Sequence, residues 1–135
     1  MRLFICLFSS LFPPELQVEF SNLQEAKGSL YVAVYNREDA FLNVQQVYAK
    51  KIAPIGQTGT LKLSLANLPS GKYALSCFQD LNGNGQLDTN LLGIPTEPYG
   101  FSKNARPKLR APKWAEAAFD LSGSGGTIKV RLEKW

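Results

Sequence analysis

Apolar residues recur at every second position in several short stretches of this chain, and this spacing limits the fold more than any other feature. In residues 61–65 three leucines alternate with a lysine and a serine, and in residues 128–133 aliphatic side chains alternate with charged ones. Successive side chains of a strand point to opposite faces, so this spacing is typical of strands with one buried face. The best helical candidate is only the short stretch 114–118.

Stretches of this kind are separated by turns rich in glycine, proline and polar residues. Residues 29–35 are apolar on both faces, which indicates a central strand, whereas paired lysines in residues 46–52 suit an edge strand. Residues 89–113 show no periodicity and predict one long irregular loop, which is uncommon in a compact domain unless it is functional. About seven short strands predict an all-β fold, an antiparallel β-sandwich. The predicted strands are 16–21, 29–35, 46–52, 61–65, 73–79, 117–121 and 127–133.

The length of 135 residues fits a single domain, which we assign to residues 15–135. Residues 1–14 begin with a positive charge and continue as an apolar run too short to span a membrane. This favours a secretory signal peptide, although no small-x-small cleavage site follows. The alternative is an apolar N-terminal tail. We therefore expect an exported protein (periplasmic, at the cell surface or secreted) without a transmembrane span.

Composition argues against common kinds of catalysis. The chain has no histidine, which removes the commonest general base and the commonest transition-metal ligand. Two cysteines do not make a disulfide framework, and we predict Cys77 to be a small buried apolar residue. The net charge of +4 is a modest basic excess, compatible with weak attraction to anionic surfaces.

Residues 80–88 carry oxygen-bearing side chains at alternate positions, which is the spacing of a calcium-binding loop. Calcium takes six to eight hard oxygen ligands, and alternate positions of a coiled loop converge on a common centre. Gly85 falls at the sixth position, where such a loop turns sharply. The alternative is a pair of Asn-Gly turns. The predicted ligands within the loop are Asp80, Asn82, Asn84, Gln86 through its backbone carbonyl, and Asp88.

The predicted loop is incomplete when it is compared with an EF-hand. Its twelfth position is Leu91, where an EF-hand has a bidentate glutamate. Glu97 is the nearest acidic residue downstream, and we expect it to fold back and complete the shell. With so few charges the affinity should be low, with a Kd of roughly 10⁻⁴ to 10⁻³ M. Magnesium suits the loop less well, because it demands strict octahedral geometry.

Two further stretches are candidates for contact with a partner. Tyr99, Phe101 and Asn104 could form a ligand-binding lip beside the metal, or the two aromatic residues could simply anchor the long loop. A basic run could meet polyanionic sugars or lipid head groups, or be a solvated loop; nucleic acid is not expected for an exported protein. The run comprises Lys103, Arg106, Lys108, Arg110 and Lys113, followed by Trp114.

Residues 73–90 and the Gly-Ile-Pro to Tyr-Gly-Phe-Ser stretch within residues 93–105 together resemble the signature of the DUF2141 family. Residues 16–35 and 114–119 are also similar to the family. These are small, generally exported bacterial proteins of unknown function. The resemblance implies an Ig-like or transthyretin-like sandwich and an exported location, but no activity. The family commonly has histidine just before the loop aspartate, where this chain has Gln79.

Together these features predict an exported, non-catalytic binding or accessory module with a calcium-stabilised loop. Its partner would be a carbohydrate, a peptide or an envelope protein. One alternative is a structural protein–protein interaction domain without bound metal. Another is an acid–base hydrolase that uses Asp80, Asp88 and Glu97, but carboxylates at this spacing are better explained by calcium.

Overall fold

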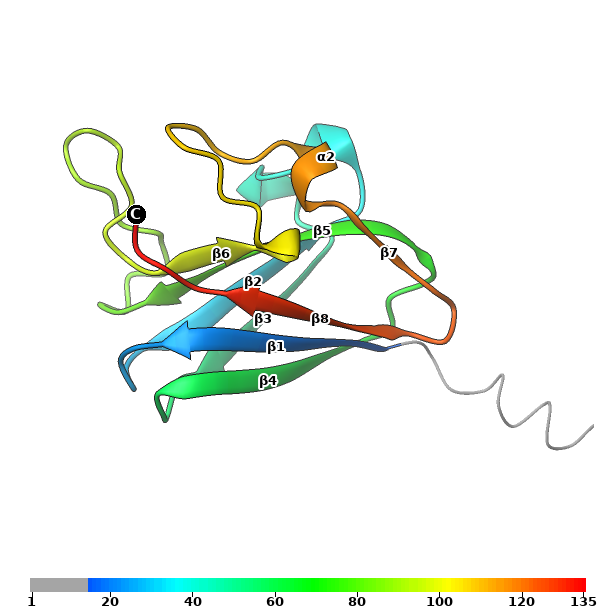
Figure 1. The fold of residues 1–135 in the computed structure, drawn as a ribbon, viewed down its shortest axis with the longest axis horizontal. Coiled ribbons are helices and arrows are strands. Elements are labelled where there is room, and N and C mark those ends of the chain that lie inside the picture. The colour runs from blue at the N-terminus through cyan, green and yellow to red at the C-terminus, as the bar shows by residue number, and fades with distance from the viewer. Residues whose placement is uncertain (1–14) are drawn as a thin grey trace, which may run out of the picture.

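The computed structural model describes residues 15–135, which form two β-sheets and almost no helix (Figure 1). One sheet has the strand order β4-β1-β8, and the other has the order β3-β2-β5-β6, with β7 paired to β5. The all-β prediction is confirmed. The elements are β1 (Glu15–Leu23), β2 (Ser29–Tyr35), η1 (Glu38–Ala40), η2 (Val44–Gln46), β3 (Ala49–Pro54), β4 (Gly59–Ala66), β5 (Gly71–Asp80), β6 (Tyr99–Phe101), η3 (Ser102–Asn104), α2 (Trp114–Ala117), β7 (Phe119–Leu121) and β8 (Gly126–Arg131).

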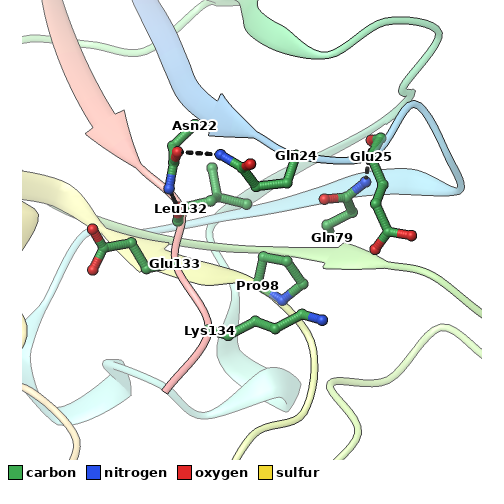
Figure 2. A pocket seen from close by; sticks show the side chains of 8 residues that line it. All are labelled: Asn22, Gln24, Glu25, Gln79, Pro98, Leu132, Glu133 and Lys134. Atoms are coloured by element: carbon green, nitrogen blue, oxygen red, sulfur yellow. Dashed lines mark hydrogen bonds between the residues drawn. The ribbon is translucent and has the colours of Figure 1, made fainter.

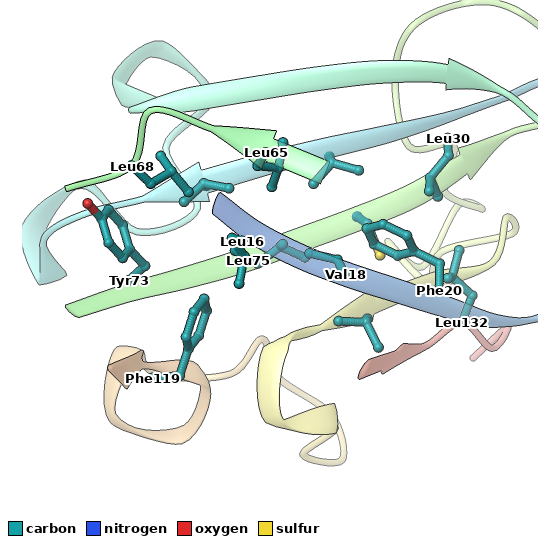
Figure 3. Close-up of a cluster of buried hydrophobic side chains, with 14 of the residues drawn as sticks. Leu16, Val18, Phe20, Leu30, Leu65, Leu68, Tyr73, Leu75, Phe119 and Leu132 are labelled. Carbon is teal, nitrogen blue, oxygen red and sulfur yellow. The ribbon is translucent and has the colours of Figure 1, made fainter. Parts of the chain in front are cut away.

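The two sheets share one apolar core in a sandwich-like arrangement (Figure 3). Leu16, Val18 and Phe20 point inward from β1 and are fully buried, as their alternation predicts. They pack in one cluster with residues of the five-stranded sheet such as Leu30 and Leu75. Full burial of one such side chain contributes roughly 1.5–3 kcal/mol, so this core is the main source of stability.

Several strand predictions hold closely. Residues 29–35 form β2, which is central because it pairs with β3 on one side and β5 on the other. The lysine-bearing β3 is an edge strand, as expected, but it begins later because Val44–Gln46 forms a short 3-10 helix. The predicted short helix is present as α2, so β7 is shorter than the predicted strand 117–121. Among residues 15–135, no helix is long and apolar enough to cross a membrane.

The prediction of a purely antiparallel sandwich is wrong at one pairing, because β1 and β8 run parallel. The preceding strand, β7, pairs with β5 in the other sheet. After the turn Ser122–Gly125 the chain crosses to the three-stranded sheet. It then enters β8 at the end where β1 also begins, so that Leu16 pairs with Gly126. The parallel direction of β8 relative to β1 therefore follows from the crossover between the sheets and not from the alternation within either strand.

The prediction of one irregular loop over residues 89–113 is also corrected. Residues Tyr99–Phe101 form β6, which pairs antiparallel with the last part of β5. Ser102 follows and is buried; its hydroxyl accepts a hydrogen bond from the Leu75 amide at 2.9 Å and donates one to the Ala117 carbonyl at 2.5 Å. This part of the connection is therefore tied both to the sheet and to α2.

Cys77 is buried on the inner face of β5, as predicted. Burial raises the pKa of its thiol far above the ordinary value, and the Gly100 carbonyl lowers it by a smaller amount. In a Cys6→Ser background, we expect a thiol reagent to label Cys77 only after unfolding. Because the thiol ionises more readily in the unfolded chain, stability should fall as the pH rises above about 8.5. Rapid labelling of the folded protein would contradict the buried position.

The predicted signal segment, residues 1–14, lies outside the described residues, and so does Cys6.

Candidate metal-binding site

The Asp80–Asp88 loop begins where β5 ends. Asp80 is buried, and its carboxylate accepts hydrogen bonds from the backbone amides of Gly83 at 3.0 Å and Gly85 at 2.8 Å. Both glycines have positive φ, 78° and 74°, a region that side-chain-bearing residues rarely adopt. The chain therefore turns sharply around the Asp80 carboxylate, and Gly85 has the conformation that its position in the loop predicts.

Side chains at alternate positions of the loop converge on Asp88. The side-chain nitrogen of Asn84 donates to one Asp88 carboxylate oxygen at 2.5 Å, and the side-chain nitrogen of Asn82 donates to the other. The side-chain oxygen of Asn82 accepts a hydrogen bond from the backbone N–H of Asn84 at 3.3 Å. The side-chain oxygen of Asn84 accepts one from the backbone N–H of Gln86 at 3.0 Å. Asn82, Asn84 and Asp88 thus share one centre, whereas the Gln86 side chain is exposed.

Glu97 folds back onto the loop, as the sequence predicts. A short hairpin in which Thr89 pairs with Pro95 reverses the chain after the loop. The returning Glu97 is buried, and its carboxylate accepts from the Leu81 amide at 2.7 Å and the Asp88 amide at 2.9 Å. The side chain therefore joins the two ends of the loop. Its role as a metal ligand stays a prediction.

The residues of the loop fit calcium through amide as well as carboxylate oxygens. Within residues 15–135, no three or more His, Cys, Asp or Glu side chains gather closely enough to hold a metal alone. Asn82 and Asn84 already point at Asp88. A half-turn of each terminal amide would present oxygen to the same centre, at the cost of the hydrogen bonds that these oxygens accept from the backbone of Asn84 and Gln86. Carboxylate, amide and backbone oxygens are the ligands that calcium accepts. A set with so few charges predicts weak binding.

Two of the three carboxylates predicted for acid–base catalysis are buried and engaged by the backbone. Both oxygens of Asp80 and both oxygens of Glu97 accept backbone hydrogen bonds, and both residues are buried. A general acid or base must reach the proton that it transfers. Of the three predicted carboxylates, only Asp88 is partly exposed. The arrangement favours a structural role for Asp80 and Glu97.

The structure separates the members of the predicted ligand lip. Tyr99 and Phe101 lie on the outer face of β6 with their rings edge to face at 5.9 Å, and the Arg106 guanidinium lies 4.1 Å from the Tyr99 ring centre. The Asn104 side-chain oxygen instead accepts from the Arg131 amide at 2.9 Å. Asn104 therefore joins η3 to β8, and its oxygen is engaged within the fold.

Two aromatic residues outside the predicted lip extend this surface. Phe78 pairs across the strands with both Tyr31 and Tyr99, and the Tyr31 and Phe78 rings stack at 5.1 Å. We call Tyr31, Phe78, Tyr99 and Phe101 the aromatic row. A methyl group at Gly85 would lie 3.6 Å from the Tyr31 hydroxyl, so the loop lies against this row. In the sequence, the aromatic row was detectable only as aromatic residues at positions that alternate with core residues along the strands.

A pocket of about 380 Å³ lies beside Gln79 (Figure 2). The Gln79 side chain is fully buried, and its nitrogen donates to the carbonyls of Glu25 at 2.9 Å and Lys27 at 2.8 Å. These bonds set the orientation of the amide, and its oxygen has no partner among the described residues. Gln79 thus acts as a tether for the segment between β1 and β2. The pocket is lined by Asn22, Gln24, Glu25, Gln79, Pro98, Leu132, Glu133 and Lys134.

The arginines and the lysines of the basic run differ in their contacts within the fold. Arg106 donates to the carbonyls of Tyr99 and Glu133, and Arg110 forms a two-bond ion pair with Glu116 at 2.7 and 2.9 Å. Hydrogen bonding from Arg110 lowers the pKa of Glu116 to about 2. The lysines of the run, at positions 103, 108 and 113, are exposed.

Comparisons with known proteins give one family and one distant structure. The model of DUF2141, described as an uncharacterized protein conserved in bacteria, matches residues 18–129. No curated protein matches the chain. A fimbrial assembly protein from Parabacteroides distasonis is similar at 10% identity and a TM-score of 0.47. That likeness covers 91% of this chain and 53% of the other, so this chain spans about half the length of the fimbrial protein. A TM-score of 0.47 is too low to support an argument about function.

Proposed function

Since this chain belongs to DUF2141, the family of uncharacterized proteins conserved in bacteria, we propose its function from the geometry of its site. The protein is a non-catalytic accessory domain that acts outside the cytoplasm, and calcium orders its segment 80–97. The observation that carries this proposal is the convergence of Asn82 and Asn84 on Asp88, in a loop whose ends are joined by Glu97.

Calcium would be held by Asp88 and the two asparagine side chains, with Asp80 and the Gln86 carbonyl as further oxygen donors. Each Asp80 oxygen accepts one backbone hydrogen bond and keeps a second lone pair. When bound, calcium supplies positive charge that replaces the amide-to-carboxylate contacts at the centre of the loop. The chain's own contribution is rigidity, because the Glu97 carboxylate is buried and positions both ends of the loop.

A thermal melt tests this role of calcium. At ten times its Kd, an ion that binds only the folded state adds about 1.4 kcal/mol of stability, which raises the Tm by about 4–6 °C for a domain of this size. Asp88→Ala should abolish the rise. Asp39→Ala removes an exposed carboxylate outside the loop and should keep it. An unchanged wild-type Tm at 10 mM calcium, about ten times the upper limit of the expected Kd, would contradict the site. Asp80→Ala is less informative, because it also removes two backbone contacts.

The aromatic row is the surface we assign to the partner, and a carbohydrate is the first partner to test. All four rings offer apolar area, and the two tyrosines also keep a polar group available. The row lies against the loop at Gly85. A glycan array with and without calcium is the experiment. We expect binding that Phe78→Ala weakens and that calcium strengthens by ordering the neighbouring loop. A protein or peptide partner becomes the better proposal if no glycan binds under either condition.

The finer fold class is also a proposal. An Ig-like or transthyretin-like sandwich is supported by two packed sheets with a common core. Such domains commonly display their connecting loops for recognition. A metal-free structural domain is the second candidate, and the melt described above separates it from the calcium-binding one.

A further inference from the structure

Exposed apolar side chains are distributed unevenly over the molecule. Residues 15–135 contain seven large apolar residues with high exposure, and none of them lies on β1, β4 or β8. The outer face of that three-stranded sheet is polar, with Gln17 between Ser64 and Thr127 and with Glu19 between two lysines. The seven residues are Val44, Tyr48, Ile52, Leu91, Leu92, Leu109 and Trp135.

The most exposed of these residues sit at the tips of two loops. Leu91 and Leu92 lie at the end of the hairpin closed by Thr89 and Pro95, and they are 105% and 84% exposed. Leu109 is 84% exposed, and its φ of 65° is uncommon for leucine. In Figure 1 both loops project away from the three-stranded sheet, on the side where the segment between β2 and β3 also rises.

The two loops carry basic charge only, whereas the neighbouring segment between β2 and β3 also carries the exposed acidic residues Glu38 and Asp39. Residues 89–96 carry no charge, and residues 98–115 contain five basic and no acidic residues. Arg106 and Arg110 are engaged with carboxylates of the fold, whereas Lys103, Lys108 and Lys113 are exposed. Within residues 15–135 these three lysines form no ion pair. They surround Leu109 in the sequence.

From these observations we propose that Leu91, Leu92 and Leu109, with Lys103, Lys108 and Lys113, form a membrane-docking face for an anionic phospholipid bilayer. Protruding leucines on separate loop tips are suited to insertion among lipid head groups, because each tip can bury its apolar group alone. A protein interface would instead present a contiguous packed patch. The lysines add attraction to anionic lipid, which is strong only close to the surface. This inference goes beyond the proposed function and does not require calcium.

Vesicle co-sedimentation in EDTA tests the proposal. The full chain is mixed at low salt with phosphatidylcholine vesicles that contain about a third phosphatidylglycerol, and with vesicles of phosphatidylcholine alone. We expect binding to the anionic vesicles that weakens about tenfold or more when salt is raised well above physiological strength. Leu91→Ser/Leu92→Ser and Leu109→Ser should each weaken binding about tenfold, because a tip no longer inserts. These substitutions are at exposed positions and should leave folding intact.

A matched pair of charge variants separates docking at this face from general attraction. Lys108→Gln and Lys129→Gln remove the same charge, but Lys129 lies on the outer face of the three-stranded sheet. Only Lys108→Gln should weaken vesicle binding.

All the proteins carry residues 1–14, so any contribution from that segment cancels in the comparison. The proposal is overturned if the wild type does not sediment with anionic vesicles, if the leucine variants bind equally well, or if both lysine variants lose affinity alike. Adding calcium in a second series shows whether loop order contributes, and failure of the calcium site leaves the EDTA result unaffected.

Discussion

Replacing Glu97 with glutamine is expected to lower the free energy of unfolding by about 2–4 kcal/mol. The Glu97 carboxylate is buried and accepts from the amides of Leu81 and Asp88. Glutamine keeps one acceptor and turns an N–H group toward the other amide, so one buried donor loses its partner. Urea unfolding measures the loss, and amide hydrogen exchange shows where it acts.

The matched control is Glu38→Gln, which makes the same chemical change at an exposed carboxylate in η1. We expect it to change stability by less than about 0.5 kcal/mol. In Glu97→Gln, the amides of Leu81 and Asp88 should lose protection before the strands do. If their protection stayed at the wild-type level, Glu97 would not be the residue that closes the loop.

Replacing Gly28 with alanine is expected to lower the free energy of unfolding by about 2–5 kcal/mol. Gly28 has a φ of 70°, and a Cβ atom there would lie 1.9 Å from the Asp80 carbonyl oxygen. The positive φ costs a side-chain-bearing residue about 1–2 kcal/mol, and overpacking against backbone adds about 1–3 kcal/mol. The contact is with the first residue of the metal-binding loop, so the substitution should also disturb Asp80.

Gly93→Ala is the control for this substitution. Gly93 has a similar φ of 77°, but nothing lies within 4 Å of its Cβ position. It should therefore show only the cost of the positive φ, about 1–2 kcal/mol. Denaturant unfolding of both variants separates the two contributions. Equal losses would mean that the backbone near Asp80 moves aside without difficulty.

The strands and the loop were predictable because both depend on local spacing. The alternation in residues 16–21 places Leu16, Val18 and Phe20 in the core regardless of which strand pairs with β1. The turn at Gly85 follows from its position in the loop. The return of Glu97 was predictable because few other acidic residues lie within reach downstream of the loop.

The remaining features depend on contacts between distant parts of the chain. The strand β6 could not be predicted from the sequence, because three residues are too few to show an alternation. Its hydrogen-bond partners come from β5. The parallel pairing of β1 with β8 follows from a crossover that no single strand encodes. The aromatic row arises only when Tyr31, Phe78 and Tyr99 are brought together by the register of three strands. Likewise, the oxygen of Asn104 is engaged by β8, which lies far along the chain.

The most direct test of the account is a calcium titration followed by the amide signals of a ¹⁵N-labelled protein. We expect the signals of Gly83, Gly85 and Asp88 to shift together and to saturate at one ion per chain, with a Kd of roughly 10⁻⁴ to 10⁻³ M. The same signals should stay in place in Asp88→Ala. Unchanged loop signals in the wild type at about 10 mM calcium, or equal shifts in Asp88→Ala, would contradict calcium binding by the Asp80–Asp88 loop.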